Sequence, residues 1–304
     1  WAQAPITTPK TLGVHSVSVS LATLREYIDW TPFFLTWSLA GKYPRILEDE
    51  IVGKEATDLF KDAQAMLDHL CDNELLTAKG VYGVFAANSV DDDIHITNSD
   101  GEVVVAHHLR QQTHKPKGAN YCLSDYIAPV DSQRQDYIGA FAVTAGIGEE
   151  ALSAAYIADG DDYNSIMVKA LADRLAEAFA EYLHQQVRVE GWGYAADETL
   201  DNESLIRELY QGIRPAPGYA ACPEHTEKQL IWDLLDAQAR TTMELTESYA
   251  MFPGAAVSGW YFAHPDARYF AVAQIQADQV ADYTARKGWD DQTAQMWLGP
   301  NING

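Results

Sequence analysis

The amino-acid sequence predicts one α+β domain with a mostly antiparallel sheet. Helical and strand-like segments are interspersed along the chain, hairpin-type turns recur between the strand-like runs, and no regular alternation of strand and helix appears. The 304 residues are enough to bury a large hydrophobic core. No internal repeat, low-complexity tract or second linker divides them, which favours one domain over two.

The N-terminal part is expected to hold an extension followed by two helices. Residues 1–14 read as a linker or extension, and the start at Trp rather than Met suggests a piece of a longer protein. Ser20 is a suitable N-cap for a short helix over 20–28. Pro32 disfavours helical backbone just before it, so we expect a turn there. Apolar residues at helical spacing predict an amphipathic helix over 55–70.

Short β-rich runs and one long helix follow. Strands are predicted at 81–85, 94–96, 102–106 and 137–143, with residues 99–101 as a hairpin turn between the second and third. Apolar residues at three- and four-residue spacing predict a helix over 164–188. Its acidic residues Asp173, Glu177 and Glu181 stack together, which is typical of a solvated face.

The C-terminal third is expected to hold three shorter helices and a β-hairpin. Asn202 as N-cap and Gly212 as stop predict a helix over 203–211. Pro223 is placed to open the next helix in its first turn, with Glu224 and Glu227 near the positive end of the helix dipole. Residues 257–264 and 268–275 are expected to pair as a hairpin. A last helix runs from about Asp278 to Gly288.

The composition excludes several classes of function. Asp and Glu number 44 against 21 Lys and Arg, which gives a formal net charge of −23. Such a charge repels nucleic-acid phosphates and anionic membrane surfaces, so we expect neither nucleic acid nor membrane as a partner. Neither a membrane-spanning apolar window nor a signal-peptide pattern appears. Three widely spaced cysteines without zinc-type spacing fit a reducing, cytoplasmic location.

Three motif-like patterns carry little weight. The Gly146-x-Gly148-x-x-Ala151 pattern follows a predicted strand, but no second strand ends in an acidic residue for a ribose, so an ordinary strand-to-helix turn is favoured. The histidines at 107, 108 and 114 lack a carboxylate or cysteine at ligand spacing, and no metal site is predicted. Cys222 is a nucleophile candidate for which the sequence identifies no base.

Residues 214–223, Arg-Pro-Ala-Pro-Gly-Tyr-Ala-Ala-Cys-Pro, form the most unusual segment. Its three prolines fix φ and remove N–H donors, which predicts a preformed, non-helical loop. The N–H groups of Ala216, Gly218 and Tyr219 are expected to stay available, and Arg214 offers a bidentate fork for a carboxylate. The segment therefore suits an anionic group, and a rigid connector between two helices explains it equally well.

Five motifs, in one order along the chain, resemble a known family. They are Asp29-Trp-Thr-Pro-Phe-Phe34, Ala40-Gly-Lys-Tyr-Pro-Arg-Ile-Leu-Glu48, Ala170-Leu-Ala-Asp-Arg-Leu-Ala-Glu-Ala-Phe179, Arg214-Pro-Ala-Pro-Gly-Tyr219 and Ser258-Gly-Trp-Tyr-Phe262. Together they resemble the C-terminal activation domain of cobalamin-dependent methionine synthase. The resemblance implies a single C-shaped α+β domain over residues 15–304, built on a twisted antiparallel sheet and unrelated to Rossmann-type methyltransferases.

The resemblance also implies a function. In that family the domain binds S-adenosylmethionine and presents it to cobalamin, held by a neighbouring domain, after the cofactor has become inactive cob(II)alamin. An electron from flavodoxin or a flavoprotein reductase and the methyl group of S-adenosylmethionine then restore methylcobalamin for methionine biosynthesis. The chain is expected to be one domain of a 5-methyltetrahydrofolate–homocysteine methyltransferase that binds no metal directly. By itself it is not expected to make methionine.

The resemblance assigns residues to the S-adenosylmethionine site. They are Asp29, Arg214, Ala216, Gly218, Tyr269, Phe270, Glu177 and Glu208. Asp29 matches the partner of the ligand's amino group and Arg214 the partner of its carboxylate. Ala216 and Gly218 match backbone contacts, Tyr269 and Phe270 an aromatic pair, and Glu177 and Glu208 acidic groups. No acid–base catalyst is implied, because the domain acts mostly by positioning the methyl donor.

Two more positions match residues that face cobalamin and its displaced histidine ligand, namely Tyr219 and His225. A departure from the family pattern is Ala220, where the family has proline. This difference loosens the loop slightly and removes no contact group.

Two rivals to the reactivation-domain hypothesis stay open. In the first, the chain is a docking module for flavodoxin and the cobalamin domain without independent ligand binding. In the second, it is an acidic stand-alone binding protein, and the missing start Met argues against this. Binding of S-adenosylmethionine to the isolated chain distinguishes the docking module from the reactivation domain. Flavodoxins are themselves acidic, so docking requires a local basic patch. We expect that patch from Lys42, Arg45, Lys115 and Lys117.

Overall fold

A six-stranded antiparallel sheet forms the backbone of the molecule, as a computed structural model describes it for residues 1–302. The strand order is β4-β3-β2-β5-β8, with β1 beside the first half of β2. The strands are β1 (Gly13–Ser18), β2 (Thr77–Val90), β3 (Asp93–Thr97), β4 (Val103–His107), β5 (Asp136–Ile147) and β8 (Ala256–Tyr261). Every pairing between them is antiparallel. The predicted α+β class and antiparallel sheet are confirmed.

The two long central strands, β2 and β5, separate two hydrophobic cores. Phe141 and Val143 of β5 join one core, whereas Ala140 and Ala142 join the other, because successive side chains of a strand point to opposite faces. Both faces of β5 are buried, which explains its almost continuous apolar sequence. The sheet is therefore the middle layer of the fold.

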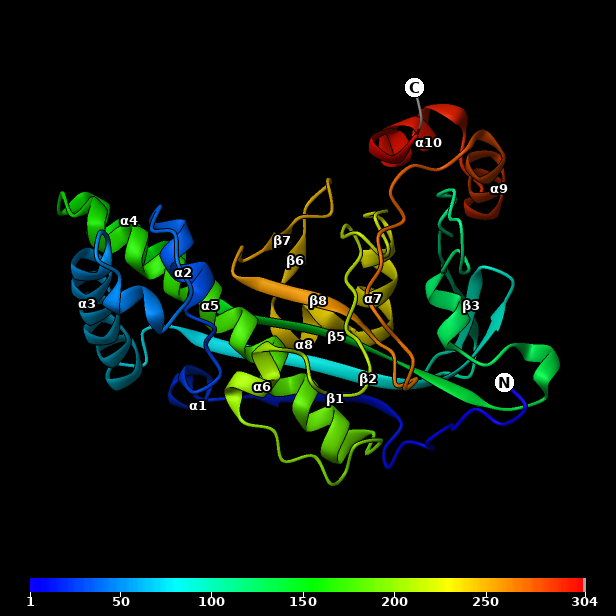
Figure 1. The fold of residues 1–304 in the computed structure, drawn as a ribbon, viewed down its shortest axis with the longest axis horizontal. Helices are drawn as coiled ribbons and strands as arrows, with labels where there is room; N and C mark the ends of the chain where they lie inside the picture. Colours follow the sequence, from blue (N-terminus) through cyan, green and yellow to red (C-terminus); the bar gives the residue numbers. More distant parts are fainter. Residues whose placement is uncertain (303–304) are drawn as a thin grey trace.

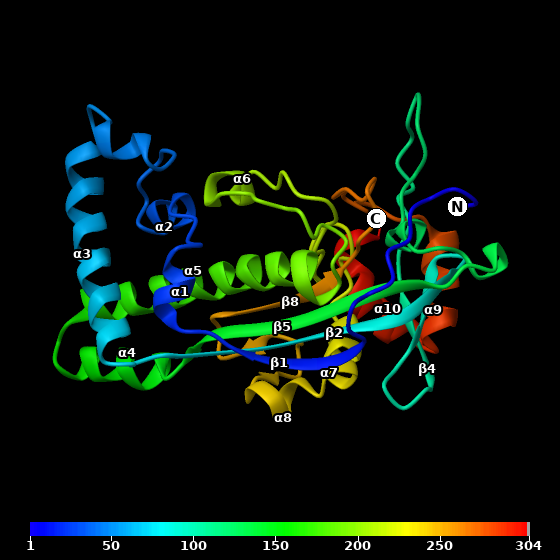
Figure 2. The ribbon, with the colours of Figure 1, turned by 90° about the horizontal axis from the view of Figure 1, so that it is seen from below.

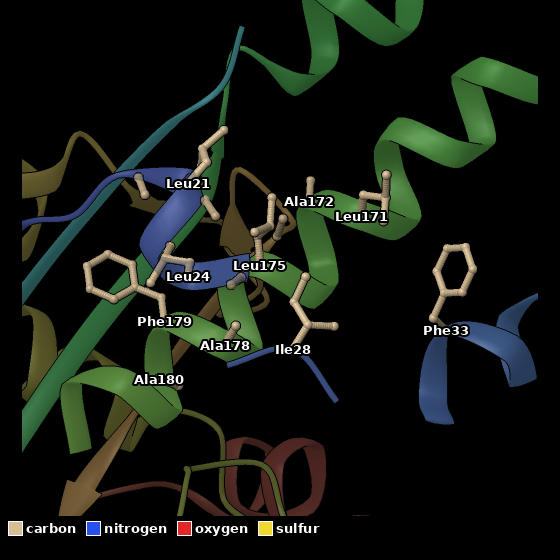
Figure 3. Close-up of a cluster of buried hydrophobic side chains, with 14 of the residues drawn as sticks. Leu21, Leu24, Ile28, Phe33, Leu171, Ala172, Leu175, Ala178, Phe179 and Ala180 are labelled. Atoms are coloured by element: carbon tan, nitrogen blue, oxygen red, sulfur yellow. The ribbon is translucent and has the colours of Figure 1, made fainter. Parts of the chain in front are cut away.

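Helices cover both faces of this sheet (Figure 2). The long helix α5 (Asp162–Gln186) packs on one face, and α7 (Glu227–Leu235) with α8 (Ala237–Thr241) packs on the other. Leu21 and Leu24 of α1 (Leu21–Arg25) meet Leu175 and Phe179 of α5 in the first core (Figure 3). The apolar stripe that predicted the long helix is thus the face that α5 buries against the sheet and α1.

The molecule has a C-shaped outline, as expected (Figure 1). One arm contains α2 (Thr31–Thr36), α3 (Gly53–Asp72) and α4 (Glu149–Ala158). The other arm contains α9 (Ala277–Lys287) and α10 (Asp291–Leu298), which have a small core of their own around Tyr283 and Leu298. The sheet connects the two arms (Figure 1).

Several local predictions are confirmed. The Ser20 hydroxyl accepts a hydrogen bond from the Thr23 N–H at 3.2 Å and caps α1. β3 and β4 form the predicted hairpin, and Gly288 ends α9 with a φ of 65°. Residues 146–151 form the expected strand-to-helix turn between β5 and α4. These features depend on neighbours in the sequence, which is why the sequence predicts them.

The predicted hairpin of 257–264 with 268–275 is wrong. β8 pairs with β5, and residues 268–275 form no strand. They run past the proline-rich loop instead, where the Val272 N–H donates to the Ala220 carbonyl at 2.8 Å. The apolar residues in this segment reflect burial of Val272 and Ile275 under the C-terminal arm rather than sheet pairing.

Three helix starts also differ from the prediction. Helix α2 begins at Thr31 with Pro32 in its first turn, so the proline opens a helix there instead of only turning the chain. α6 (Asn202–Ile206) is capped by Asp201, not Asn202, and ends well before Gly212. α7 begins at Glu227, four residues after Pro223.

The remaining elements are short. They are β6 (Glu244–Leu245), β7 (Met251–Phe252), the turns η1 (Arg45–Glu48), η2 (Leu123–Tyr126), η3 (Val130–Ser132) and η5 (Gly299–Asn301), and the π-helical turn η4 (Val187–Gly191). Residues preceding β1 pack against η4, since Trp192 Nε1 donates to the Thr7 carbonyl at 2.9 Å. In residues 1–302 no helix is both long and apolar enough to cross a membrane.

Candidate functional site

A pocket of about 320 Å³ lies beside β8, between the proline-rich loop, α5 and α7. Of the residues predicted for ligand binding, Arg214, Ala216, Glu177, Tyr269 and Phe270 line it, and so does Tyr219. Most of the other lining residues are apolar. A mostly apolar hollow with a few convergent polar groups is typical of a small-molecule site.

The loop reaches the pocket because it pairs with β8 on the side away from β5. Ile213 and Phe262 exchange backbone hydrogen bonds of 3.1 and 3.0 Å, and the Trp260 N–H donates to the Pro215 carbonyl at 2.9 Å. Gly259 accommodates this approach, since a Cβ there would lie 2.6 Å from the Pro215 oxygen. The pairing fixes Arg214 and Ala216 in the pocket wall.

The end of the loop is a tight turn that uses its own N–H groups. The Gly218 N–H donates to the Cys222 carbonyl at 2.8 Å, and the Tyr219 N–H donates to the Ala216 carbonyl at 3.1 Å. The prediction that these two N–H groups stay available is therefore wrong, because the turn consumes them. Gly218 has a φ of 94°, and a Cβ at this residue would clash with the ring of His225.

Arg214 is held by a buried polar cluster that the sequence did not indicate. Its guanidinium pairs with Glu181 through Nη2 at 2.7 Å, and Nη1 donates to the Tyr210 hydroxyl at 2.6 Å and to Nδ1 of His184 at 3.2 Å. The Arg214 N–H also donates to the Tyr269 hydroxyl at 3.0 Å. These contacts fix the direction of the guanidinium before any ligand arrives.

The charges in this cluster are consistent with that arrangement. Burial opposes the charge of Arg214, but Glu181, Tyr210 and Tyr269 outweigh it and hold the pKa of Arg214 above its usual value. Burial and the neighbouring arginines lower the pKa of His184 well below its usual value, so the imidazole is neutral and can accept from Arg214. Glu181 was expected on a solvated face, and its side chain is in fact buried.

Glu177, one turn earlier on α5, lies at the pocket and is accessible to solvent. Partial desolvation at the pocket wall raises the pKa of its carboxyl, and the positive charges of Arg174 and Arg214 partly oppose this increase. The pocket thus combines a guanidinium, a carboxylate and aromatic rings.

Asp29 lies in a different hollow. Its Oδ1 accepts from the Thr31 N–H at 3.0 Å, and with Lys42 and Arg45 it lines a groove of about 1160 Å³ closed on one side by α6. Glu208 lines neither hollow in this conformation. Residues 202–214 connect the two sites, because α6 lines the groove and Arg214 lines the pocket.

Tyr219 and His225 are both exposed near the pocket. The Tyr219 side chain is 71% exposed, and His225 packs its ring against Gly218. Lys228, a residue that the sequence analysis did not single out, lines the pocket from α7 and hydrogen-bonds Nδ1 of His225 at 2.9 Å. No pattern in the sequence marked Lys228 as a pocket residue.

The predicted single basic patch is wrong. Lys42 and Arg45 lie in the groove beside Asp29, in the segment between α2 and α3 and hence on the arm that holds these helices. Lys115 lies near the other arm, where its ammonium donates to the Ala119 carbonyl at 2.8 Å and sits over the ring of Tyr121. Sequence position gave no information on this separation.

Within residues 1–302, no group of three or more His, Cys, Asp or Glu side chains is arranged to hold a metal ion. Cys71, Cys122 and Cys222 are free. Burial raises the pKa of the Cys222 thiol, which makes it a poor nucleophile.

Comparison with known proteins adds two findings. The family model described as the activation domain of vitamin B12 dependent methionine synthase matches residues 20–288. A crystal structure of the MetH reactivation domain bound to AdoHcy is 62% identical in sequence, with a TM-score of 0.98, over 100% of this chain and 94% of that chain.

Proposed function

The chain belongs to the activation-domain family of vitamin B12 dependent methionine synthase, and from this premise we propose how its pocket performs the family's function. It is an S-adenosylmethionine-binding reactivation domain. The observation that carries this function is the ligand of the 62% identical relative, because AdoHcy is what remains of S-adenosylmethionine after its methyl group has left.

Arg214 is the proposed partner of the ligand carboxylate. Its Nη groups contact Glu181, Tyr210 and His184, and its Nε makes no hydrogen bond within the described residues. Three of the five guanidinium N–H donors are thus used, so the Nε N–H and the second N–H of Nη2 remain for a carboxylate, which a guanidinium can bind with two parallel hydrogen bonds. Because the cluster already orients Arg214, the ligand does not have to order it, which favours affinity.

The rest of the pocket suits the rest of the ligand. Glu177 supplies negative charge for a sulfonium cation, and Tyr269 and Phe270 supply aromatic surface for the adenosyl group. Ala216 keeps a backbone N–H that forms no hydrogen bond within residues 1–302. Gly218 contributes through its backbone conformation, which lets the loop pass under His225.

Asp29 is the proposed partner of the ligand's amino group, although it lines the neighbouring groove. The amino group and the carboxylate are bonded to the same carbon, so this assignment requires Asp29 and Arg214 to meet at one end of the ligand. Glu208 belongs to residues 202–214, which connect the two sites, and would add negative charge there. An Asp29→Asn variant should weaken binding of S-adenosylmethionine while leaving binding of a ligand without the amino group unchanged.

The cobalamin-binding domain of the same protein is the partner that a reactivation domain serves. We propose that exposed Tyr219 and His225 face it, since both lie next to the pocket. Cobalamin, held by that domain, supplies the cobalt centre that receives the methyl group. The chain's own residues bind and orient the methyl donor, which makes the transfer an intramolecular event.

The family's domain is part of methionine synthase, which is a methyltransferase. We propose that the whole protein is a 5-methyltetrahydrofolate–homocysteine methyltransferase and that the isolated chain makes no methionine. The electron is proposed to come from flavodoxin or a flavoprotein reductase. We also propose a cytoplasmic location, on the basis of the three free cysteines.

Calorimetric titration of S-adenosylmethionine and of AdoHcy into the isolated chain tests the ligand proposal. We expect saturable binding by the wild-type chain and its loss in Arg214→Ala. A Tyr269→Ala variant serves as a second probe, since Tyr269 is 42% exposed and tolerates truncation better than the buried cluster. If the folded wild-type chain binds neither ligand, the docking-module hypothesis replaces this one.

The flavodoxin proposal now depends on Lys42 and Arg45, which share one groove with Arg25 and Arg207. Changing Lys42 and Arg45 to Gln should weaken flavodoxin binding and reduce its dependence on salt. The same changes at Lys115 and Lys117 provide the matched control. Equal effects from the two pairs would contradict the assignment.

A further inference from the structure

The pocket has two different ends, contributed from opposite sides of the sheet. Glu177 comes from α5, and Glu181 of the same helix holds Arg214. Lys228 comes from α7, which covers the other face (Figure 2). β8 lies between them, and residues 256–258 of this strand line the pocket. A ligand whose carboxylate meets Arg214 therefore extends across the edge of the sheet toward Lys228.

Lys228 is an unusual residue for a pocket wall. It is only 7% exposed, and within residues 1–302 its ammonium forms one hydrogen bond, to Nδ1 of His225 at 2.9 Å, and no ion pair. The nearby carboxylate of Glu224 instead lies 3.4 Å from the ammonium of Lys287. An ammonium carries three N–H donors, so two remain. Burying a charge with so few partners is costly, which suggests that a ligand supplies another partner.

The surroundings of Lys228 indicate the kind of group that binds there. The side chains of Ala221, Met251, Ala256 and Phe270 line the same pocket and offer apolar and aromatic surface without a strong acceptor. An adenine base fits this environment, because it is flat and its three ring nitrogens other than the one bonded to ribose are acceptors. Lys228 can only donate, so it complements a ring nitrogen and not the exocyclic amino group.

We propose that Lys228 is a specificity-determining residue that donates a hydrogen bond to a ring nitrogen of the adenine of S-adenosylmethionine. This inference rests on the proposed ligand site. Lys228 then recognises the base, while Arg214 recognises the amino-acid end. The bond from Lys228 to His225 also connects the base to the exposed surface beside Tyr219.

The test is a binding cycle that combines Lys228 variants with altered ligands. Affinities of AdoHcy and of its 1-deaza, 3-deaza and 7-deaza analogues are measured by calorimetry for the wild-type chain, Lys228→Met and Lys228→Arg. Met keeps the unbranched stem without the charge, and Arg keeps a donor. We expect Lys228→Met to bind AdoHcy about tenfold to a hundredfold more weakly, as for loss of a hydrogen bond from a charged donor, with partial recovery in Lys228→Arg.

The cycle separates failure of this inference from failure of the proposed function. One deaza analogue should bind the wild-type chain as weakly as AdoHcy binds Lys228→Met, and Lys228→Met should not distinguish the two ligands. Equal binding of all four ligands by the wild-type chain overturns the inference, and this result does not depend on whether the variants fold. An unchanged affinity of folded Lys228→Met for AdoHcy overturns it too. If the wild-type chain binds neither AdoHcy nor S-adenosylmethionine, the proposed function fails and the inference fails with it.

Discussion

Replacing Glu181 by Gln should destabilise the folded domain, although the two side chains have nearly the same shape. Oε2 of Glu181 lies 2.7 Å from Nη2 of Arg214, and the two side chains are 9% and 17% exposed. Little water can therefore reach the Arg214 guanidinium to solvate it once the carboxylate charge is removed. The change leaves a buried guanidinium facing a neutral amide.

The magnitude follows from the burial of the pair. A hydrogen bond to a charged group contributes about 1.5–3 kcal/mol, against about 0.5–1.5 kcal/mol for a neutral one, and Gln can still accept one bond from Arg214. We therefore expect Glu181→Gln to lower the free energy of unfolding by the difference, about 1–1.5 kcal/mol. Glu181→Leu leaves the buried guanidinium with only the neutral partners Tyr210 and His184 and should cost about 3–5 kcal/mol.

Urea unfolding at neutral pH without ligand is the assay, with the denaturant slope compared between variants to verify that the same transition is measured. Glu177→Gln is the matched control, because Glu177 is one turn away on the same helix, is exposed and forms no ion pair among the described residues. That change should alter stability by no more than about 0.5 kcal/mol. Equal unfolding midpoints for Glu181→Gln and Glu177→Gln would refute the reasoning.

Three further predictions concern the stability of the same domain. Gly218→Ala should lower the free energy of unfolding in urea by about 1–3 kcal/mol, because the residue has a φ of 94° and a Cβ would displace His225. Gly160→Ala, at a φ of 75° with open space around it, should lower it clearly less, and equal losses would argue against the clash. Leu175→Ala removes a fully buried side chain between α5 and α1 and should cost about 2–5 kcal/mol; a loss below 1 kcal/mol would mean that the core refills the space. Burial lowers the pKa of His108 to about 3, so below pH ~6.5 the unfolded chain binds a proton that the folded chain does not, and the free energy of unfolding should fall by up to about 1.4 kcal/mol per pH unit. His108→Leu should reduce that slope between pH 6 and 4, and an unchanged slope would contradict a neutral buried imidazole.

Much of the fold could be predicted because its signals are local. A helix cap such as Ser20, a periodic apolar stripe such as that of α5 and a hairpin such as β3–β4 each depend on residues a few positions apart. The five motifs also specified the family, because together they span nearly the whole chain. Arg214, Tyr269 and Glu177 were therefore expected at one site, and the pocket brings them together.

The errors concern contacts between distant parts of the chain. An apolar run such as 268–275 shows that residues are buried but not what buries them, so the hairpin partner was wrong and β5 took its place beside β8. Likewise, the acidic stripe on α5 is the same in sequence whether it faces water or an arginine. Only packing of the loop on β8 brings Arg214 against Glu181, 33 residues away.

The sequence alone determined the class of fold, the long helices and the family, because each is specified by local spacing or by matched motifs. The tertiary structure decided which charges are buried, which side chains share a pocket and how Lys228 meets His225. The physical reason is that burial and electrostatic partners are properties of the assembled surfaces. A residue's charge, pKa and access to a ligand are set by neighbours that only folding brings near.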